Sequence, residues 1–382
     1  MIRRRKTAAK APPKLTVNPL TAKWNGGFAI PPFEKIEVRH FKPALEAAFR
    51  EHNAEIEKIA KNPAKPTFAN TILALEKSGW QLSRIASLFW NLEASDSSPE
   101  LQEVARDMAP RFAAHETHVL LDKRLFKRID DLFERRESLK LSDEDRRVLE
   151  RHHLEFVRAG ARLSAADKAR VKKINARLAT LVTQFMQNVL KDEQSWQLVL
   201  EGDNDLSGLP PTLRESAERA AADAGLKGKA LITLARSSVE GFLTFSARRD
   251  LREQAFNAWI KRGATDGETD NRQIVAEAVA LRNEYARLMG FKSFAEFSLQ
   301  DTMAKTPGAV SDLLSGVWIK ALERAGEERD ALRAEAQRAG DNSPIMPWDW
   351  RYFAEKVRKA KFDFDESKLQ PYLELENMIG AA

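Results

Sequence analysis

A chain of 382 residues, 43% hydrophobic and 31% charged, has the composition of a folded globular protein, which excludes a disordered chain or a coiled-coil rod. It contains no cysteine, which excludes disulfides, thiolate zinc sites and a cysteine nucleophile. No apolar run approaches the roughly 18–20 residues that a membrane span requires, so we expect no membrane partner.

The positive charge is concentrated at the N-terminus. Residues 1–33 contain no acidic residue and carry a charge of +7. The whole chain has a net charge of +6, so the charges of the other 349 residues sum to −1. The basic residues are Arg3, Arg4, Arg5, Lys6, Lys10, Lys14 and Lys23. We predict a disordered basic arm over residues 1–17, a solvated tail rather than a nucleic-acid contact, and no nucleic-acid partner. The arm lacks the apolar region of a secretory signal, and we expect a cytoplasmic location.

Residues 18–192 have the pattern of an N-terminal helical domain. Apolar side chains recur every three to four residues, and capping residues or prolines separate the runs. The pattern predicts helices over about 40–61, 67–92, 98–136, 142–160 and 164–190. Ser98 followed by Pro99 marks the start of the third helix. Pro110 is expected to kink or interrupt that helix.

Residues 193–246 predict a small β insertion in a fold that is otherwise mainly α. Strands are expected at 196–200, 230–234 and 242–245, with a helix over 211–224, and together they predict a three-stranded sheet near 195–245. Residues 225–244 are interpreted as sheet packing rather than as an insertion that contacts substrate. Helices resume over 247–262, 270–289 and 309–339, within a third segment of residues 247–382.

The histidines do not form a recognisable catalytic or metal site. His115 and His118 lie three residues apart on one helix face and could reach one ion, but surface or core histidines are favoured there because no third ligand is apparent. His152 and His153 point about 100° apart on a helix and cannot chelate together. The chain contains no His-Glu-x-x-His, phosphate-binding loop or nucleophile elbow. We therefore assign no catalytic residue and no metal ligand.

The most unusual composition lies in residues 347–379, where aromatic, acidic and proline residues concentrate. The segment contains Pro347-Trp348-Asp349-Trp350-Arg351-Tyr352-Phe353-Ala354-Glu355-Lys356, then Phe364-Asp365-Glu366 and Pro371-Tyr372-Leu373-Glu374-Leu375-Glu376-Asn377. It resembles the segment that precedes the zinc motif in the M3 (thimet oligopeptidase-like) metallopeptidases, nearest to their peptidyl-dipeptidase and oligopeptidase A branch. Further similar stretches follow in family order at 18–20 with 31–33, 156–161, 185–190, 282–286, 288–291 and 303–307. The resemblance thus extends over about residues 18–379.

The resemblance implies a mainly helical, two-lobed body with a deep channel that admits short peptides. In the full-length family a zinc ion at the channel floor activates water, and a glutamate acts as base. The zinc motif of the family lies beyond residue 382, so no ligand or base can be transferred to this chain, and no zinc is expected to bind it. The expectation is therefore the N-terminal portion of an M3 peptidase, a fragment that is inactive alone. The alternative is a non-catalytic peptide-binding or scaffold protein derived from that family.

Within residues 347–352 two interpretations remain open. The structural interpretation makes Asp349 a cap near a helix start and the tryptophans packing residues. The functional interpretation places Trp348, Asp349, Arg351 and Tyr352 on the substrate channel, because polar aromatic side chains line ligand clefts. If further chain covers residues 347–379 in the whole peptidase, aromatic side chains there are expected to be exposed.

Overall fold

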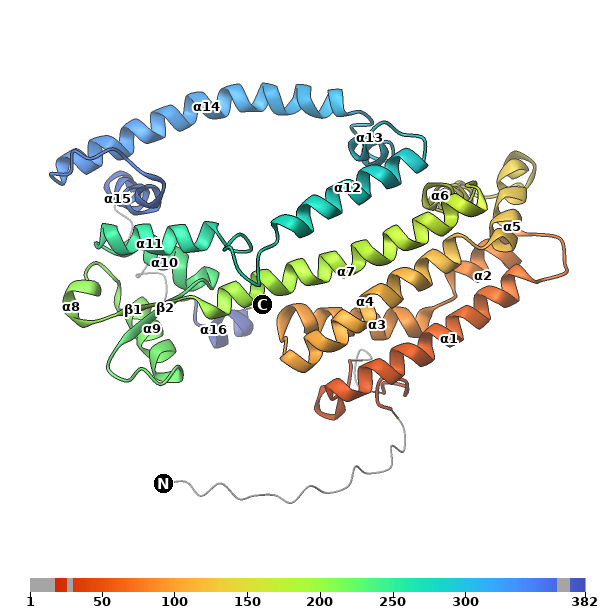
Figure 1. Ribbon diagram of the computed structural model, residues 1–382, viewed down its shortest axis with the longest axis horizontal. Helices are drawn as coiled ribbons and strands as arrows, with labels where there is room; N and C mark the ends of the chain where they lie inside the picture. The colour runs from red at the N-terminus through yellow and green to blue at the C-terminus, as the bar shows by residue number, and fades with distance from the viewer. Residues whose placement is uncertain (1–17, 26–29, 363–371, 382) are drawn as a thin grey trace, which may run out of the picture. The chain divides into compact units, whose positions relative to one another are not determined.

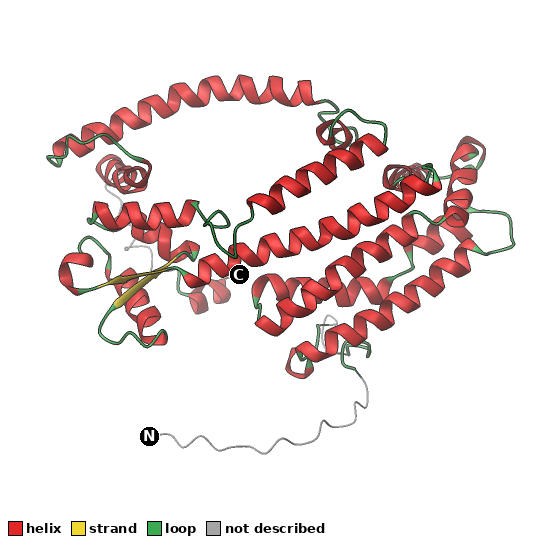
Figure 2. Cartoon of the chain, viewed as in Figure 1, coloured by secondary structure: helices red, strands yellow, loops and turns green. Residues whose placement is uncertain are grey.

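The computed structural model describes residues 18–25, 30–362 and 372–381. The predicted basic arm of residues 1–17, and the Phe364-Asp365-Glu366 stretch, lie outside these residues. Contacts between residues divide the chain into two compact units. Unit 1 contains residues 1–184 and 278–294, and unit 2 contains residues 185–277 and 295–382. Each unit is built mainly of helices (Figures 1 and 2), which confirms the predicted fold class.

Unit 1 is a packed array of helices. They are α1 (Phe41–Ala60), α2 (Leu73–Glu76), α3 (Trp80–Ser95), α4 (Pro99–Leu120), α5 (Lys123–Glu134), α6 (Asp143–Ala159), the first part of α7 (Ala165–Ser195) and the later part of α12 (Arg272–Leu288). One apolar cluster joins α1, α3 and α4 around Phe41 and Phe89, and a second joins α1, α5 and α6 around Ile129 and Phe156. The helical stripes predicted from the sequence therefore supply the core of this unit.

Two helices predicted for unit 1 are interrupted in the structure. The predicted helix over 67–92 is broken between α2 and α3, at Gly79 with φ +70°, and the predicted helix over 98–136 is broken between α4 and α5. Ser98 caps α4 as expected, because its Oγ accepts the backbone N–H of Leu101 at 3.2 Å. Pro110 lies inside α4 without ending it, and the break falls instead after Leu120. There the Asp122 carboxylate accepts the N–H groups of Arg124 and Leu125 at 2.8 and 2.9 Å and starts α5. A side-chain cap thus sets the boundary, and the proline does not.

Unit 2 combines a two-stranded sheet with helices. Its elements are the end of α7, β1 (Gln197–Leu200), α8 (Gly202–Asp205), α9 (Pro211–Asp223), β2 (Ala230–Thr233), α10 (Arg236–Phe245), α11 (Arg249–Ile260), the first part of α12 (Arg272–Leu288), most of α13 (Phe294–Leu299), α14 (Pro307–Arg338), α15 (Trp350–Phe362) and α16 (Leu375–Ala381). β1 and β2 are antiparallel, with Gln197 opposite Thr233 and Leu200 opposite Ala230. Figure 2 shows this sheet in yellow among the helices.

The predicted third strand at 242–245 is wrong. These residues form the last turn of α10, and the sheet of the described residues has two strands. Val239, Phe242 and Leu243 are buried at three-to-four spacing, which is the apolar stripe of a helix. A run of four apolar residues fits a strand or a buried helix turn equally well, so periodicity within 242–245 could not decide.

Candidate functional site

The segment singled out in the sequence occupies one place in unit 2. A 3₁₀ turn at Pro347–Asp349 leads directly into α15. This segment contacts α10 and α11, and α15 also packs beside the C-terminal part of α14 (Figure 1). Phe353 of α15 is buried against Leu332 and Ala336 of α14. The site is therefore anchored by helices that lie about a hundred residues earlier in the chain as well as by its neighbour.

Asp349 is the centre of a buried ion-pair cluster with Arg249 and Arg252, both on α11. Its side chain is 1% exposed and that of Arg252 is 2% exposed. Arg249 donates from Nε and one terminal nitrogen to the carboxylate, at 3.0 and 2.7 Å. Arg252 donates to Oδ1 of the carboxylate at 2.8 Å, the oxygen that also accepts from the Arg249 Nε. The two arginines stand three residues apart and so share one face of α11.

The remaining polar groups of this cluster are also satisfied. Arg252 donates to the backbone carbonyls of Ser246 and Trp348 at 2.7 and 3.2 Å. The N–H of Met346 donates to Asp349 at 3.1 Å, so the carboxylate also caps the turn that precedes α15. Burial opposes ionisation of Asp349, but hydrogen bonds from Arg249, Met346 and Arg252 outweigh it and lower its pKa. The carboxylate is thus held ionised by hydrogen bonds from the surrounding arginines and backbone.

The other candidates around Asp349 also contact their own unit. The ring of Tyr352 lies under the Arg252 guanidinium, 4.1 Å from its carbon. Arg351 donates to Glu240 of α10 at 3.0 Å and lies 5.5 Å from the Trp259 ring. Trp348 is partly buried near Phe256. The structural interpretation accounts for each of these contacts, and a role of Trp348, Asp349, Arg351 and Tyr352 in a substrate channel stays a prediction.

A groove lies on the side of α15 that faces α14. It has a volume of about 470 Å³. Its apolar lining includes Leu332, Trp350 and Phe362, and its rim carries charges of both signs, with Arg324, Glu327 and Lys361 among them. Phe362 is 71% exposed, whereas Phe353 of the same segment is 3% exposed, so the expected exposure of aromatic residues holds for only part of the segment. Apolar walls with a few polar groups at the edge are typical of ligand sites.

Sequence reasoning missed the arginines of α11 and the α14 wall of the groove. Asp349 lies 97 and 100 residues from its two partners, a separation that no local pattern reveals. The sequence contained one weak signal of the cluster. Arg249 and Arg252 stand on one face of a predicted helix, and two buried arginines need an acidic partner. Trp350, which the sequence-based site did not include, lines the groove, whereas the four residues predicted for the channel are not among its lining residues.

Two of the histidines, His52 and His115, form a close pair in unit 1 rather than a metal site. His52 Nδ1 lies 2.9 Å from His115 Nε2, and His52 Nε2 lies 3.2 Å from Ser78 Oγ. His118 is exposed on the same helix as His115. Over the described ranges 18–25, 30–362 and 372–381, no three histidine, aspartate or glutamate side chains are grouped so that they could hold a metal ion. The residues present there do not fit the zinc site that the family implies.

The His52–His115 pair should make unit 1 sensitive to acid. Burial, with the nearby His52 and His118, lowers the pKa of His115 to about 4. An unfolded histidine titrates near 6.5, so between about pH 6.5 and pH 4 the unfolded chain takes up a proton that the folded chain refuses. Stability should therefore fall over this window, by about 1–2 kcal/mol because the ring is only half buried. Urea unfolding at pH 7 and pH 4.5 measures the loss.

Two variants separate this effect from general acid unfolding. His115→Gln keeps a hydrogen-bonding group beside His52 but cannot titrate, and it should reduce the pH dependence between pH 7 and 4.5; the part that remains belongs in part to His52 and His153, whose pKa values burial also lowers. His118→Gln, at the exposed position, removes only the smallest of the three causes of the lowered His115 pKa and should change the slope far less than His115→Gln. Equal slopes in the wild type and both variants would contradict the assignment to His115.

The comparisons with known proteins agree with this geometry. The description "Peptidase family M3" matches residues 242–380, which contain α11, α14 and α15. The chain is 36% identical to dipeptidyl carboxypeptidase of Escherichia coli K12 over 95% of this chain and 54% of that protein. It is 29% identical to oligopeptidase A of Haemophilus influenzae over 92% of this chain and 52% of that protein. It is also 26% identical to the organellar oligopeptidase A of Arabidopsis thaliana, over 96% of this chain.

These similarities confirm the resemblance seen in the sequence: the chain is similar to the M3 peptidases, and residues 242–380 carry the family match. The chain spans about half the length of the curated relatives that it matches. No helix among the described residues is both long enough and apolar enough to cross a bilayer.

Proposed function

We propose that this chain supplies the N-terminal, substrate-holding half of an M3-type zinc metallopeptidase that acts on short peptides in the cytoplasm, as a peptidyl-dipeptidase or an oligopeptidase. The observation that carries the proposal is the match over 95% of the chain to a protein named for peptide hydrolysis. The groove between α14 and α15, with Trp350 on its wall, is the surface offered to peptide. Trp348, Arg351 and Tyr352 belong to the same segment, while Asp349 fixes its position from inside the fold.

On this proposal the chain alone binds peptide but does not cleave it. The described residues provide no set of three metal ligands, so zinc and its activated water belong to residues other than these. We expect the purified 382-residue chain, supplied with zinc and short peptides, to show no hydrolysis that a chelator abolishes. Detecting released products by mass spectrometry checks this. Robust chelator-sensitive cleavage by the chain would contradict the proposed division of roles.

Peptide binding can be tested at the groove itself. Trp350 contributes an aromatic wall, and truncating such a side chain in a binding site costs on the order of tenfold in affinity. Trp350→Ala should therefore weaken short-peptide binding about tenfold in calorimetric titration. Trp80→Ala is the matched control, because Trp80 is an exposed tryptophan on α3 of unit 1. Equal affinity of the wild type and Trp350→Ala would place the peptide elsewhere.

The second candidate is a non-catalytic peptide-binding or scaffold protein. The observation that favours it is the lack of a three-ligand metal group in the part of the chain that the structure describes. The nucleotide sequence after the Ala382 codon separates the two. An in-frame His-Glu-x-x-His there supports the peptidase, and a stop codon with no such motif supports the binding protein.

A further inference from the structure

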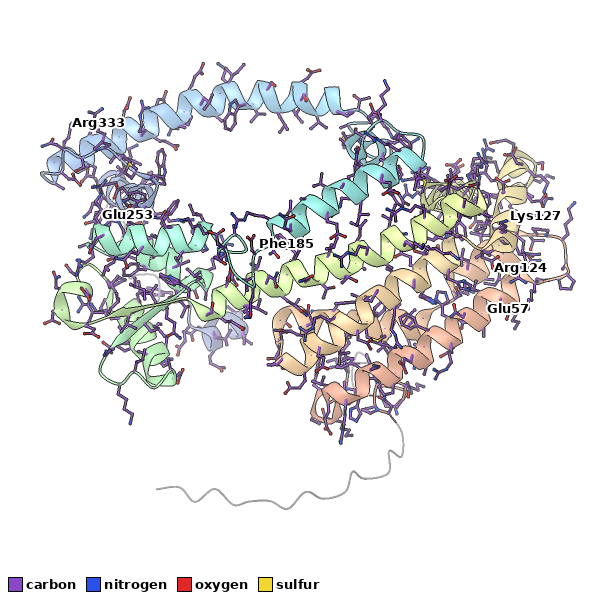
Figure 3. All side chains as sticks on the ribbon, in the orientation of Figure 1. Glu57, Arg124, Lys127, Phe185, Glu253 and Arg333 are labelled. Atoms are coloured by element: carbon purple, nitrogen blue, oxygen red, sulfur yellow. The ribbon has the colours of Figure 1, made fainter. Side chains whose placement is uncertain are left out.

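The N-terminal half of α14 presents a continuous apolar surface to solvent. Its large apolar side chains are between 54% and 69% exposed. They are Leu313, Leu314, Val317, Trp318, Ile319 and Leu322, which we call the α14 stripe. No charged residue occurs from Leu313 to Ile319. Figure 3 shows the side chains along this helix. Contiguous apolar surface of this kind marks an interaction site in a soluble protein.

The other half of the same helix shows what such a surface requires. Toward its C-terminus α14 is covered by α15, and there Leu332 is 3% and Ala336 1% exposed. That covered half carries many charged residues, including Arg324, Glu327 and Glu328. The more apolar half is thus the one without a covering element among the described residues. The surface also adjoins the groove, whose first wall residue on α14 is Arg324.

Two observations identify what covers the stripe. The M3 family match runs from 242 to 380 and so includes the whole of α14, which makes the helix part of the family fold rather than an addition peculiar to this chain. The relatives contain nearly as many further residues again, since the matched region is 54% of the Escherichia coli protein and 52% of the Haemophilus influenzae protein. We therefore infer that residues of the relatives outside the matched region cover the apolar face of this family helix.

The stripe is poorly suited to pairing with a second copy of itself. A self-associating coiled-coil pair is indicated by an apolar seam sustained over at least about three to four heptads. The apolar positions of α14 extend from Val310 to Leu322, with Asp312 and Lys320 between them, and the next turns bring Arg324, Glu327 and Glu328. The seam is therefore under two heptads long, which fits one contact within a larger folded body.

We propose that the α14 stripe is the surface on which the C-terminal half of an M3 peptidase packs, whether that half is carried on the same polypeptide or on another. This inference rests on the proposed function, because it takes the chain to be one half of such an enzyme. It adds the position of the joining surface, on α14 and next to the groove that receives peptide. Closing the groove and completing the metal centre would then be one assembly step.

The lack of cysteine makes the surface directly measurable. Val317→Cys places one thiol on the stripe, and Arg329→Cys places one on a charged, exposed position of the same helix. Each variant of the 382-residue chain is labelled with a maleimide alone and after co-expression and co-purification with the part of Escherichia coli dipeptidyl carboxypeptidase that lies outside its match to this chain. Mass spectrometry of the 382-residue chain gives the labelling rate.

Alone, both thiols should react at the rate of an exposed cysteine. In the complex, labelling at 317 should slow at least tenfold, while labelling at 329 stays unchanged. Failure to co-purify, unchanged labelling at 317 in the complex, or protection at 317 in the chain alone would each overturn the proposal, and the last would point to a second copy. Trp318→Lys should abolish co-purification, whereas Arg329→Glu should not.

Peptidase activity of the complex is measured in parallel and reports on the proposed function by itself. Protection at 317 without activity supports the packing surface and counts against the enzyme. Activity without protection supports the enzyme and overturns the packing surface.

Discussion

Replacing Asp349 with alanine should destabilise unit 2 by about 3–5 kcal/mol, because it removes one partner of a buried ion pair and leaves the others unpaired. Arg252 is 2% exposed and would keep its charge without the carboxylate. Arg249 would lose its bidentate contact, and the turn before α15 would lose the acceptor of the Met346 N–H. Guanidinium unfolding followed by tryptophan fluorescence measures the effect, since Trp348 and Trp350 flank the substituted residue.

A surface pair on α14 provides the control. Asp330 contacts Arg329 at 3.2 Å, and the two side chains are 69% and 62% exposed. Asp330→Ala removes the same chemical group from water-exposed surroundings and should change stability by less than about 1 kcal/mol. If Asp349→Ala and Asp330→Ala have similar effects, the arginine–aspartate cluster does not anchor the segment.

The same cluster sets an acid limit for unit 2. The folded pKa of Asp349 lies below its ordinary value of about 3.9, so its contribution is complete above that value and is lost as the pH falls through the folded pKa. Between pH 7 and pH 5 the cluster should be insensitive to pH, in contrast to the histidine pair of unit 1. Asp349→Ala should remove the part of the acid transition that lies below about pH 4.

Much of the helical architecture follows from local patterns, because caps and apolar stripes act within a few residues. Ser98, Ser142 and Gly160 mark helix ends in the sequence, and each performs that role in the structure. The stripe of α7 was likewise readable, and Val171, Ile174 and Leu181 are buried. The rule that a proline interrupts a helix was too simple at Pro110, because α4 continues through this residue.

The candidate site was less accessible to sequence reasoning, because its contacts join distant residues. The unusual composition of residues 347–356 singled out the segment, but it could not show that Asp349 is buried between two arginines of α11. The aromatic run also did not show which ring faces outward; Trp350 reaches the groove, while Tyr352 stacks on Arg252. Family resemblance supplied the chemistry that these contacts alone do not define.

Gly208→Ala should destabilise unit 2 by about 2–4 kcal/mol, for two separable reasons. Gly208 has φ +85°, a conformation that costs an L-residue about 1–2 kcal/mol. An added Cβ would also lie 2.4 Å from the carbonyl oxygen of Phe245 and 2.9 Å from the nitrogen of Ala247. These are backbone atoms at the end of α10, and moving them strains the contact in which the Ala247 N–H donates to the Ser207 carbonyl at 2.9 Å.

Gly228 isolates the first cause from the second. It has φ +77°, nearly the same conformation, but a Cβ built there meets nothing within 4 Å. Gly228→Ala should therefore show the conformational cost alone, about 1–2 kcal/mol, and the difference between the two variants gives the steric cost. Gly316 in α14 has an open surrounding and no positive φ, so Gly316→Ala should stabilise by up to about 1 kcal/mol. Equal destabilisation by Gly208→Ala and Gly228→Ala would show that the loop before α9 yields freely, and that the end of α10 does not hold it in place.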